Sequence, residues 1–266
     1  MAEIDVWKDY ARRLGMPFPE EAEKDYLQEI MLREIYASIG RELVFRGGTA
    51  ISKLYASGRF SEDLDFIMDR QAGATASKTV DRVEGAIKSI GNYFNVSYEK
   101  EQYKDMVEFT VAIYGPLYRA SGNNAAKQRI GIDINMYEKC LMRPLALQRM
   151  PVYTDIGTYS LITETAEELL ADKVKAAIER RAKHRTVFVR DIYDVWFLIA
   201  KHGLGIDEKL VSKKMEMYGI MPFSAEDFGE CVQEAEKYWV KELSRIMLAP
   251  PRYEDASADI FKAIYR

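Results

Sequence analysis

Two glycines and two aspartates lie close together within residues 42–68. Gly47 and Gly48 end a short apolar stretch, and residues without a Cβ atom let the backbone turn sharply and let a ligand approach the main chain. The segment that begins at Thr49 predicts a short helix, whose first N–H groups and positive dipole end favour a bound phosphate. This turn is therefore a candidate phosphate-binding site.

The two aspartates stand in the sequence Asp63-Leu64-Asp65-Phe66, which predicts a strand. Because side chains alternate faces along a strand, Asp63 and Asp65 point to one side while Leu64 and Phe66 point into the core. Two neighbouring carboxylates repel each other unless a cation lies between them. Since Mg²⁺ commonly binds one or two carboxylates together with substrate phosphates, the stretch predicts a site for a metal ion and a nucleotide.

Strands and helices must position these residues. Alternation of apolar with polar or small residues predicts half-buried strands, and apolar residues at three- and four-residue steps predict amphipathic helices. The predicted strands are 42–46, 63–66, 95–101, 107–114 and 128–136, and the predicted helices are 21–39 and 76–94. The loop at 115–127 carries two turn signals, Gly115-Pro116 and Gly122-Asn123-Asn124.

The pattern becomes helical after about residue 140. Residues 140–160 contain Pro144, Pro151 and Gly157 and predict a connector, and residues 163–185 predict a helix. The fold class is therefore α+β. We expect a core with a mixed sheet flanked by helices in residues 1–140, and a helical C-terminal half in residues 141–266.

Basic residues cluster at the end of the helix predicted at 163–185. They are Arg180, Arg181, Lys183, His184 and Arg185, and Arg190 follows. They fit a solvated helix C-terminus, and they equally offer a surface for nucleic-acid phosphates. The cluster has no evident aromatic platform on which a base could stack.

Composition limits the class of protein. The chain has 266 residues, 48% hydrophobic, and a net charge of −4, which argues against a generally basic protein that coats nucleic acid. Its two cysteines, Cys140 and Cys231, match no metal-binding spacing and are expected to be reduced. The N-terminus lacks the apolar core of a signal peptide, and no run approaches the about 20 apolar residues of a membrane span. We expect a cytoplasmic protein with no membrane partner.

Several motifs, in this order, resemble the AbiEii/AbiGii-type toxin nucleotidyltransferase family of the DNA polymerase β-type nucleotidyltransferase superfamily. Gly47-Gly48-Thr49 with Arg59-Phe60-Ser61-Glu62-Asp63-Leu64-Asp65-Phe66 resembles its G-[GS]…D-x-D signature, at the long end of the usual spacing. Glu168-Leu169-Leu170-Ala171-Asp172-Lys173 resembles the motif that carries a helical lysine, and Arg190-Asp191-Ile192-Tyr193-Asp194 resembles R-D-x-Y-D.

One further segment, Glu23-Lys24-Asp25-Tyr26, resembles the E-K-D-Y found near the start of these proteins. From composition alone, its charges indicate a solvated helix face.

The resemblance implies a nucleotidyltransferase that moves a nucleoside monophosphate from an NTP to an acceptor, with Mg²⁺ or Mn²⁺ as cofactor. It implies metal binding by Asp63 and Asp65, and triphosphate binding by Gly47, Gly48 and Thr49 and by Lys173. It further implies that Arg59 and Ser61 fix the nucleotide-binding loop, and that Asp191 or Asp194 orients Lys173 or the acceptor.

Asp133 has two interpretations. It lies on the polar face of the strand predicted at 128–136, where an aspartate is unfavourable. It is either a solvent-exposed strand residue or, by resemblance to polymerase β-type sites, a third metal-binding carboxylate.

The resemblance also implies partners. They are an RNA acceptor, in some relatives the 3′ end of tRNA, and an antitoxin regulator encoded nearby. Two other functions stay open. One is a non-catalytic nucleotide-binding module, which would show a broken motif, and the other is a nucleotide-sugar glycosyltransferase, which also uses D-x-D with a divalent metal.

Overall fold

The computed structural model describes residues 2–73, 75–121 and 127–265, so the turn signal Gly122-Asn123-Asn124 lies outside the described residues. The chain divides into two compact units. The first, called the sheet unit, comprises residues 1–140 and 144–164, and the second, called the helical unit, comprises 141–143 and 165–266. Each unit is described by itself.

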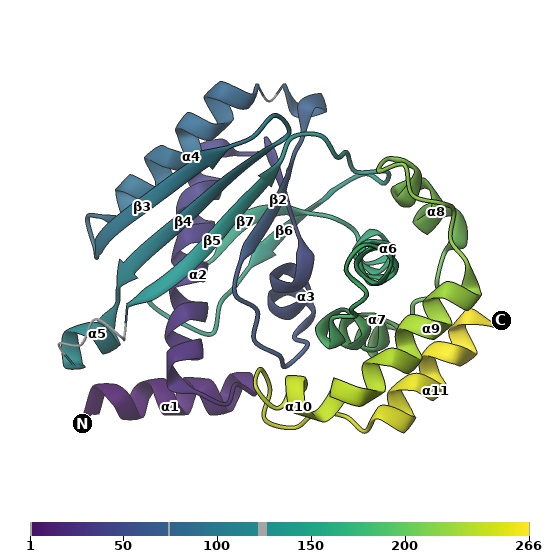
Figure 1. Ribbon diagram of the computed structural model, residues 1–266. Coiled ribbons are helices and arrows are strands. Elements are labelled where there is room, and N and C mark those ends of the chain that lie inside the picture. The colour runs from purple at the N-terminus through teal and green to yellow at the C-terminus, as the bar shows by residue number, and fades with distance from the viewer. Residues whose placement is uncertain (1, 74, 122–126, 266) are drawn as a thin grey trace. The chain divides into compact units, whose positions relative to one another are not determined.

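The sheet unit is built on a mixed sheet of seven strands in the order β3-β4-β5-β2-β1-β7-β6 (Figure 1). The strands are β1 (Leu43–Arg46), β2 (Leu64–Met68), β3 (Asn95–Gln102), β4 (Met106–Tyr114), β5 (Gln128–Asn135), β6 (Leu145–Arg149) and β7 (Tyr159–Thr163). β2 runs parallel to β5, and β1 runs parallel to β7, while the other neighbours are antiparallel. The mixed sheet predicted from the sequence is confirmed.

The prediction of a connector at 140–160 is wrong, because β6 and β7 lie within and just after it. β6 is an edge strand whose residues are all exposed or half-buried, so no alternation of apolar residues marks it. Since the sheet continues to Thr163, the sheet unit extends past the boundary predicted at residue 140.

Helices α2 (Pro19–Ile39) and α4 (Ala76–Ile90) pack against each other and cover one face of the sheet (Figure 1). α1 (Ala2–Leu14) packs on α2, and α5 (Pro116–Ser121) follows β4. α2 is buried on several sides, with Leu27, Met31 and Leu32 fully enclosed. Because α2 meets the sheet, α1 and α4 together, its charged residues are enclosed as well as its apolar ones.

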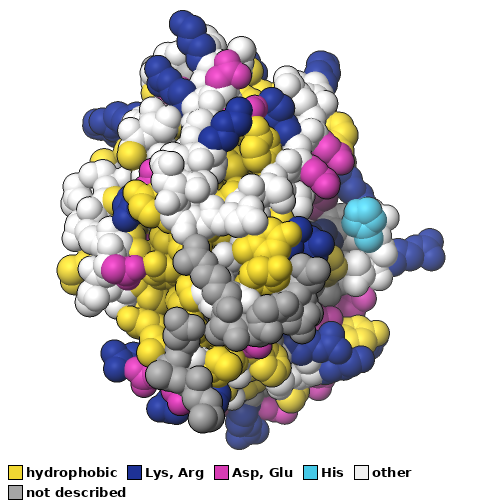
Figure 2. Space-filling view, turned by 90° about the vertical axis from the view of Figure 1, so that its left-hand side faces the viewer, with side chains coloured by type: hydrophobic (Ala, Val, Ile, Leu, Met, Phe, Trp, Pro, Cys, Tyr) yellow, Lys and Arg dark blue, Asp and Glu magenta, His cyan; other side chains and the backbone are white. Residues whose placement is uncertain are grey.

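The surface of the sheet unit carries one hollow of about 400 Å³, lined by Tyr26, Ile30, Arg33, Tyr93, Phe94, Pro116, Asp155 and Ile156. None of the residues predicted to bind nucleotide or metal lines it. Figure 2 shows one face of the molecule, on which hydrophobic side chains gather near the middle and many Lys and Arg side chains lie toward the edge. The glycine turn does not line this hollow.

The helical unit consists of α6 (Ala166–His184), α7 (Val189–His202), α8 (Glu208–Glu216), α9 (Ala225–Ala235), the 3₁₀ turn η3 (Glu236–Tyr238), α10 (Trp239–Leu243) and α11 (Tyr253–Ile264). α6 begins at Ala166, three residues after the start predicted at 163, because Thr163 ends β7, and the Thr165 hydroxyl accepts a hydrogen bond from the Glu168 N–H at 3.2 Å. α6 packs on α7, and α7 packs on α10 and α11. In the described ranges, no helix is both long enough and apolar enough to cross a lipid bilayer.

Candidate active site

The glycine turn joins β1 to the nine-residue helix α3 (Gly47–Tyr55), as predicted. Gly47 has a φ of +76°, and a Cβ atom there would lie 2.2 Å from Asp65 Oδ2. A Cβ atom on Gly48 would lie 2.4 Å from Arg59 Nη2. Both positions therefore require glycine, the first for its backbone conformation and for space, the second for space alone.

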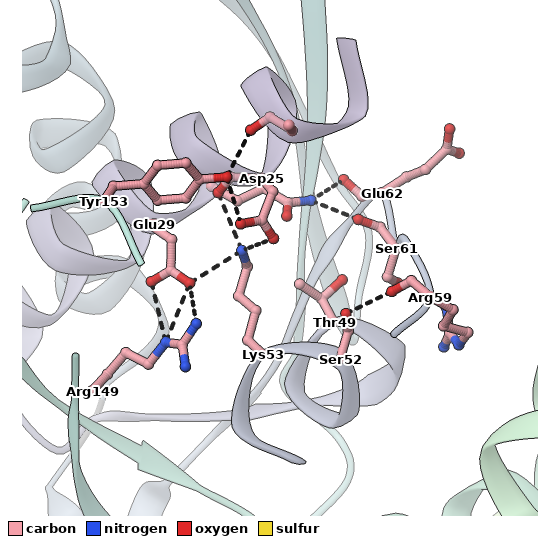
Figure 3. Close-up of polar contacts among 12 residues, drawn as sticks. Asp25, Glu29, Thr49, Ser52, Lys53, Arg59, Ser61, Glu62, Arg149 and Tyr153 are labelled. Carbon is pink, nitrogen blue, oxygen red and sulfur yellow. Dashed lines mark hydrogen bonds and ion pairs between the residues drawn. The ribbon is translucent and has the colours of Figure 1, made fainter. Parts of the chain in front are cut away.

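The loop before β2 is fixed to this turn from several sides (Figure 3). The Ser52 hydroxyl donates to the Arg59 carbonyl at 2.7 Å, and Gln28 Nε2 donates to the carbonyls of Ser61 and Glu62 at 3.0 and 2.7 Å. Arg59 is 1% exposed and its Nη1 donates to the Phe60 carbonyl at 3.0 Å. The structure thus places Arg59 and Ser61 against the turn, as parts of the loop that carries Asp63.

Thr49 differs from its sequence-based role. Its side chain is buried, and its hydroxyl donates to the Asp63 main-chain carbonyl at 2.5 Å. The hydroxyl therefore ties α3 to the start of β2 and does not point to a phosphate. A contact from Thr49 to a nucleotide would have to come from its backbone N–H.

Asp65 and Asp133 are register partners on the neighbouring parallel strands β2 and β5. Asp133 also pairs with Glu108 on β4, so these three carboxylates project from one face of the sheet. Asp63 comes directly before β2, and its Oδ1 accepts a hydrogen bond from the Gly131 N–H at 3.3 Å. The structure therefore brings together the three predicted acids and adds Glu108.

Burial and the nearby charges of Asp65, Glu108 and Asp63 raise the pKa of Asp133 to about 7. Such mutual repulsion favours a bound cation, and several carboxylate oxygens on adjacent strands form a hard donor set that suits Mg²⁺ or Mn²⁺. The oxygen donors of these residues are of the chemical type that a divalent ion requires. The surface-residue interpretation of Asp133 is not supported, because the side chain is half-buried among other acids.

The interpretation of Glu23-Lys24-Asp25-Tyr26 as a solvated helix face is wrong. Glu23 is 0% and Asp25 6% exposed. The Glu23 carboxylate accepts hydrogen bonds from the Leu117 N–H at 2.6 Å and from Gln128 Nε2 at 2.8 Å, and burial raises its pKa. This segment of α2 therefore connects the helix to other elements, with Glu23 bonded to α5 and β5.

Asp25 takes part in a buried charge cluster that anchors α3 (Figure 3). Lys53 Nζ of α3 donates to Asp25 Oδ1 at 2.5 Å and to Glu29 Oε1 at 3.3 Å. Arg149 Nη2 of β6 reaches the same Glu29 oxygen at 2.8 Å, and the Tyr153 hydroxyl donates to Asp25 Oδ2 at 3.1 Å. Burial alone would raise the pKa of Glu29, but Lys53 and Arg149 lower it below its usual value. The cluster has two acids and two bases, so its charge is balanced.

Lys24 lies beside the candidate site, and sequence reasoning missed it. Its Nζ is 3.9 Å from Glu62 Oε1 and 5.8 Å from the centre of the Phe60 ring. Burial lowers the pKa of Lys24, and the charges of Glu62 and Asp63 partly oppose this effect. A lysine at this place can contribute positive charge to whatever binds next to Asp63.

In the helical unit, the structure joins the two remaining motifs. Lys173 Nζ of α6 lies 2.9 Å from Asp191 Oδ1 and 2.9 Å from Asp194 Oδ2 of α7. Both carboxylates are buried, and Arg180 also pairs with Asp191. Two carboxylates on one turn of α7 therefore both contact the Lys173 ammonium. These contacts agree with the prediction that Asp191 or Asp194 orients Lys173.

A family model described as "Nucleotidyl transferase AbiEii toxin, Type IV TA system" matches residues 30–263. The chain belongs to this family. It is therefore a nucleotidyltransferase toxin of the AbiEii type, in keeping with the motifs that the structure assembles in each unit. None of the curated proteins compared with it matches.

Two solved structures are similar in fold to this chain. MenT4, a nucleotidyltransferase toxin from Mycobacterium tuberculosis H37Rv, has a TM-score of 0.63 at 18% identity, over 98% of this chain and 88% of that one. JHP933 from Helicobacter pylori has a TM-score of 0.54 at 16% identity, over 92% and 90%. At such identities the likeness shows the fold alone.

Proposed function

We propose that this AbiEii-type toxin transfers a nucleoside monophosphate from an NTP to an RNA acceptor, which includes the 3′ end of tRNA. The observation that carries the proposal is the register of β2 and β5, which sets Asp65 beside Asp133 with Asp63 one step away. This acidic group adjoins the glycine turn, since Gly47 is in contact distance of Asp65.

The glycine turn would hold the triphosphate. α3 begins at Gly47, so the N–H groups of its first turn have no carbonyl partner within the helix and can donate to phosphate oxygens. The absence of side chains at Gly47 and Gly48 lets Asp65 and Arg59 lie close to the main chain of this turn. Arg59 and Ser61 would fix the loop before β2, and the buried pair Lys53–Asp25 would hold α3 against α2.

Asp63, Asp65 and Asp133 would bind Mg²⁺ or Mn²⁺. When bound, the ion neutralises phosphate oxygens and makes the acceptor hydroxyl more acidic. Asp65 and Asp133 would hold the ion from neighbouring strands, and Asp133, whose pKa is raised, must lose its proton before it can bind. Phosphoryl-type transfer depends mainly on this kind of positioning and charge neutralisation.

Lys173 would neutralise charge on the departing pyrophosphate. Its ammonium is fixed by Asp191 and Asp194, which we assign as positioning residues. A fixed positive charge beside a phosphate oxygen acts most strongly when negative charge builds up there.

We further propose that the protein works in the cytoplasm, next to its RNA substrate, and that an antitoxin regulator is encoded nearby.

The test uses NTPs labelled at the α- or γ-phosphate, incubated with the protein, Mg²⁺ and total RNA. We expect a discrete RNA band labelled from the α-phosphate only, and no label with Asp65→Asn. Label on protein would replace RNA as the acceptor. Tight NTP binding without any transfer would favour a nucleotide-binding module, and transfer of a sugar from a nucleotide-sugar would favour a glycosyltransferase.

A further inference from the structure

Phe188, which ends the loop between α6 and α7, is a large apolar side chain that stays 37% exposed. Two guanidinium groups lie over its ring, with Arg180 Cζ at 4.5 Å and Arg190 Cζ at 5.2 Å from the ring centre. An aromatic ring therefore lies among the basic residues, where none was evident from the sequence. Sequence reasoning missed it because Phe188 is a single aromatic, and Arg180 of α6 reaches its ring only when α6 and α7 pack together.

We propose that Phe188, Arg180 and Arg190 form a platform on which an unpaired base of single-stranded RNA stacks. This inference rests on the proposed function, because it names the part of the protein that receives the acceptor strand. Stacking on an aromatic ring is open to every base, since each has a π face, and arginine guanidinium planes stack on bases in the same way. A base can therefore extend the stack that Phe188 and the two arginines already form.

The charges around the ring favour a phosphate backbone. Arg180 and Lys173 are balanced by Asp191 and Asp194, with Asp191 pairing with both cations. Arg190 is exposed, and within the described part of the chain no carboxylate forms an ion pair with it. The exposed Arg185, which ends α6, adds a further positive charge. The platform thus has an excess of positive charge beside an apolar surface.

A buried structural role does not explain Phe188. The ring stands before the first turn of α7 with an extended backbone, and its side chain makes no hydrogen bond that caps the helix. The adjacent Val187 and Val189 are buried and supply the apolar contacts of this loop. Between them, Phe188 is 37% exposed, and its ring is set apart from other exposed apolar side chains by the two guanidinium groups that lie over it.

Single-stranded RNA is the occupant that these contacts fit. A duplex keeps its bases paired and stacked inside, so it could meet the arginines but not the ring. A free NTP would also present a base, and this is the alternative that the experiment must separate. The two sources differ in that an RNA strand brings several backbone phosphates, which makes its binding strongly dependent on salt.

The experiment is a fluorescence anisotropy titration of a labelled single-stranded oligoribonucleotide with the full chain, in chelator and without NTP. Phe188→Ala should weaken binding roughly tenfold or more, since one stacked base contributes about 1–3 kcal/mol. Phe188→Trp should retain the affinity, whereas Phe188→Leu should lose it although leucine is apolar. Arg190→Ala should weaken binding and reduce the salt slope by about 1.

Matched controls come from the same unit. Tyr238 is 47% exposed and Arg245 is exposed, and neither belongs to the platform. Tyr238→Ala and Arg245→Ala should therefore leave RNA binding unchanged. A circular dichroism melt of each variant shows that it is folded, and Phe188→Leu gives a second test if Phe188→Ala is unstable.

Equal RNA affinity of Phe188→Ala and the wild type would overturn the proposal, as would equal loss for duplex and single-stranded RNA. Unchanged RNA affinity with weaker NTP binding in Mg²⁺ would assign the ring to the NTP base and would also overturn it. The proposed function fails separately. It fails if RNA binds through Phe188 but no α-phosphate is transferred, and it survives if transfer occurs without any role for Phe188.

Discussion

Asp65 of β2 and Asp133 of β5 are register partners on parallel strands. Burial, together with the charges of Asp65, Glu108 and Asp63, raises the pKa of Asp133 to about 7. Neighbouring acids on two rigid strands cannot separate to relieve their repulsion. We therefore expect this part of the sheet to be destabilising without a cation and to be stabilised by one.

The first prediction concerns Asp133→Asn in chelator. The pKa of Asp133 is about 7 in the folded protein and near 3.8 when unfolded, so its contribution to stability is present at low pH and is lost as the pH rises through 7. The free energy of unfolding of the variant, relative to that of the wild type, should therefore rise by roughly 1 kcal/mol from pH 5 to pH 8, after allowance for solvent screening. Urea denaturation at both pH values measures the difference.

Adding Mn²⁺ at pH 8 should reverse the order, because only the wild type has the complete set of acids. A stability gap that is the same at both pH values, or an equal gain of both proteins with Mn²⁺, would contradict the assignment of Asp133.

The second prediction concerns the glycine turn. In Gly47→Ala, the alanine would have to adopt a positive φ, and its Cβ atom would collide with the Asp65 carboxylate. The substitution should therefore lower the melting temperature and abolish NTP binding. Gly85→Ala is the matched control, since Gly85 lies within α4 with open space around it. That change should raise stability by about 0.5–1 kcal/mol and leave binding intact. Unimpaired NTP binding by Gly47→Ala would remove the turn from the site.

The third prediction concerns the buried cluster under α3. Lys53→Met leaves Asp25 with no ammonium partner and Glu29 with Arg149 alone, and uncompensated buried charges typically cost about 3–5 kcal/mol. Chemical denaturation should show this loss. Lys88→Met, which removes an exposed ion pair with Glu84, should barely change stability. A small effect of both substitutions would mean that the cluster does not hold α3.

The fourth prediction concerns Lys173. Lys173→Ala should lower kcat by ~10²-fold or more while NTP affinity falls much less, because the charge acts mainly in the transition state. The substitution also leaves the buried Asp194 without this ammonium, so stability should fall too. The double variant Lys173→Ala, Asp194→Asn restores the balance. If kcat returned with stability in the double variant, the effect of Lys173 would be structural.

The sequence was sufficient where a residue's role depends on its neighbours in the chain. Alternation at 107–114 and 128–136 gave the strands, and the spacing of Asp63 and Asp65 gave the acid pair. Edge strand β6 (Leu145–Arg149) was not predicted. It pairs with one strand only and is mostly exposed, so its sequence shows no alternation of apolar and polar residues.

The sequence was insufficient where partners come from distant parts of the chain. Asp25 is buried because Lys53 and Tyr153 meet it, and neither is close in the sequence. The Thr49 hydroxyl donates a hydrogen bond to the Asp63 carbonyl, and no sequence motif predicts this contact. Long-range pairs of this kind are set by packing and not by local periodicity.

The most direct measurement of the central claim is isothermal titration of NTP into the protein, in Mg²⁺ and in chelator, for the wild type and Asp65→Asn. We propose that the glycine turn and the three aspartates bind a triphosphate together with a metal ion. We therefore expect binding by the wild type in Mg²⁺, at least about tenfold weaker binding in chelator, and little difference between the two conditions for the variant. Equal NTP affinity of the wild type in Mg²⁺ and in chelator would contradict a shared site for the triphosphate and the metal ion.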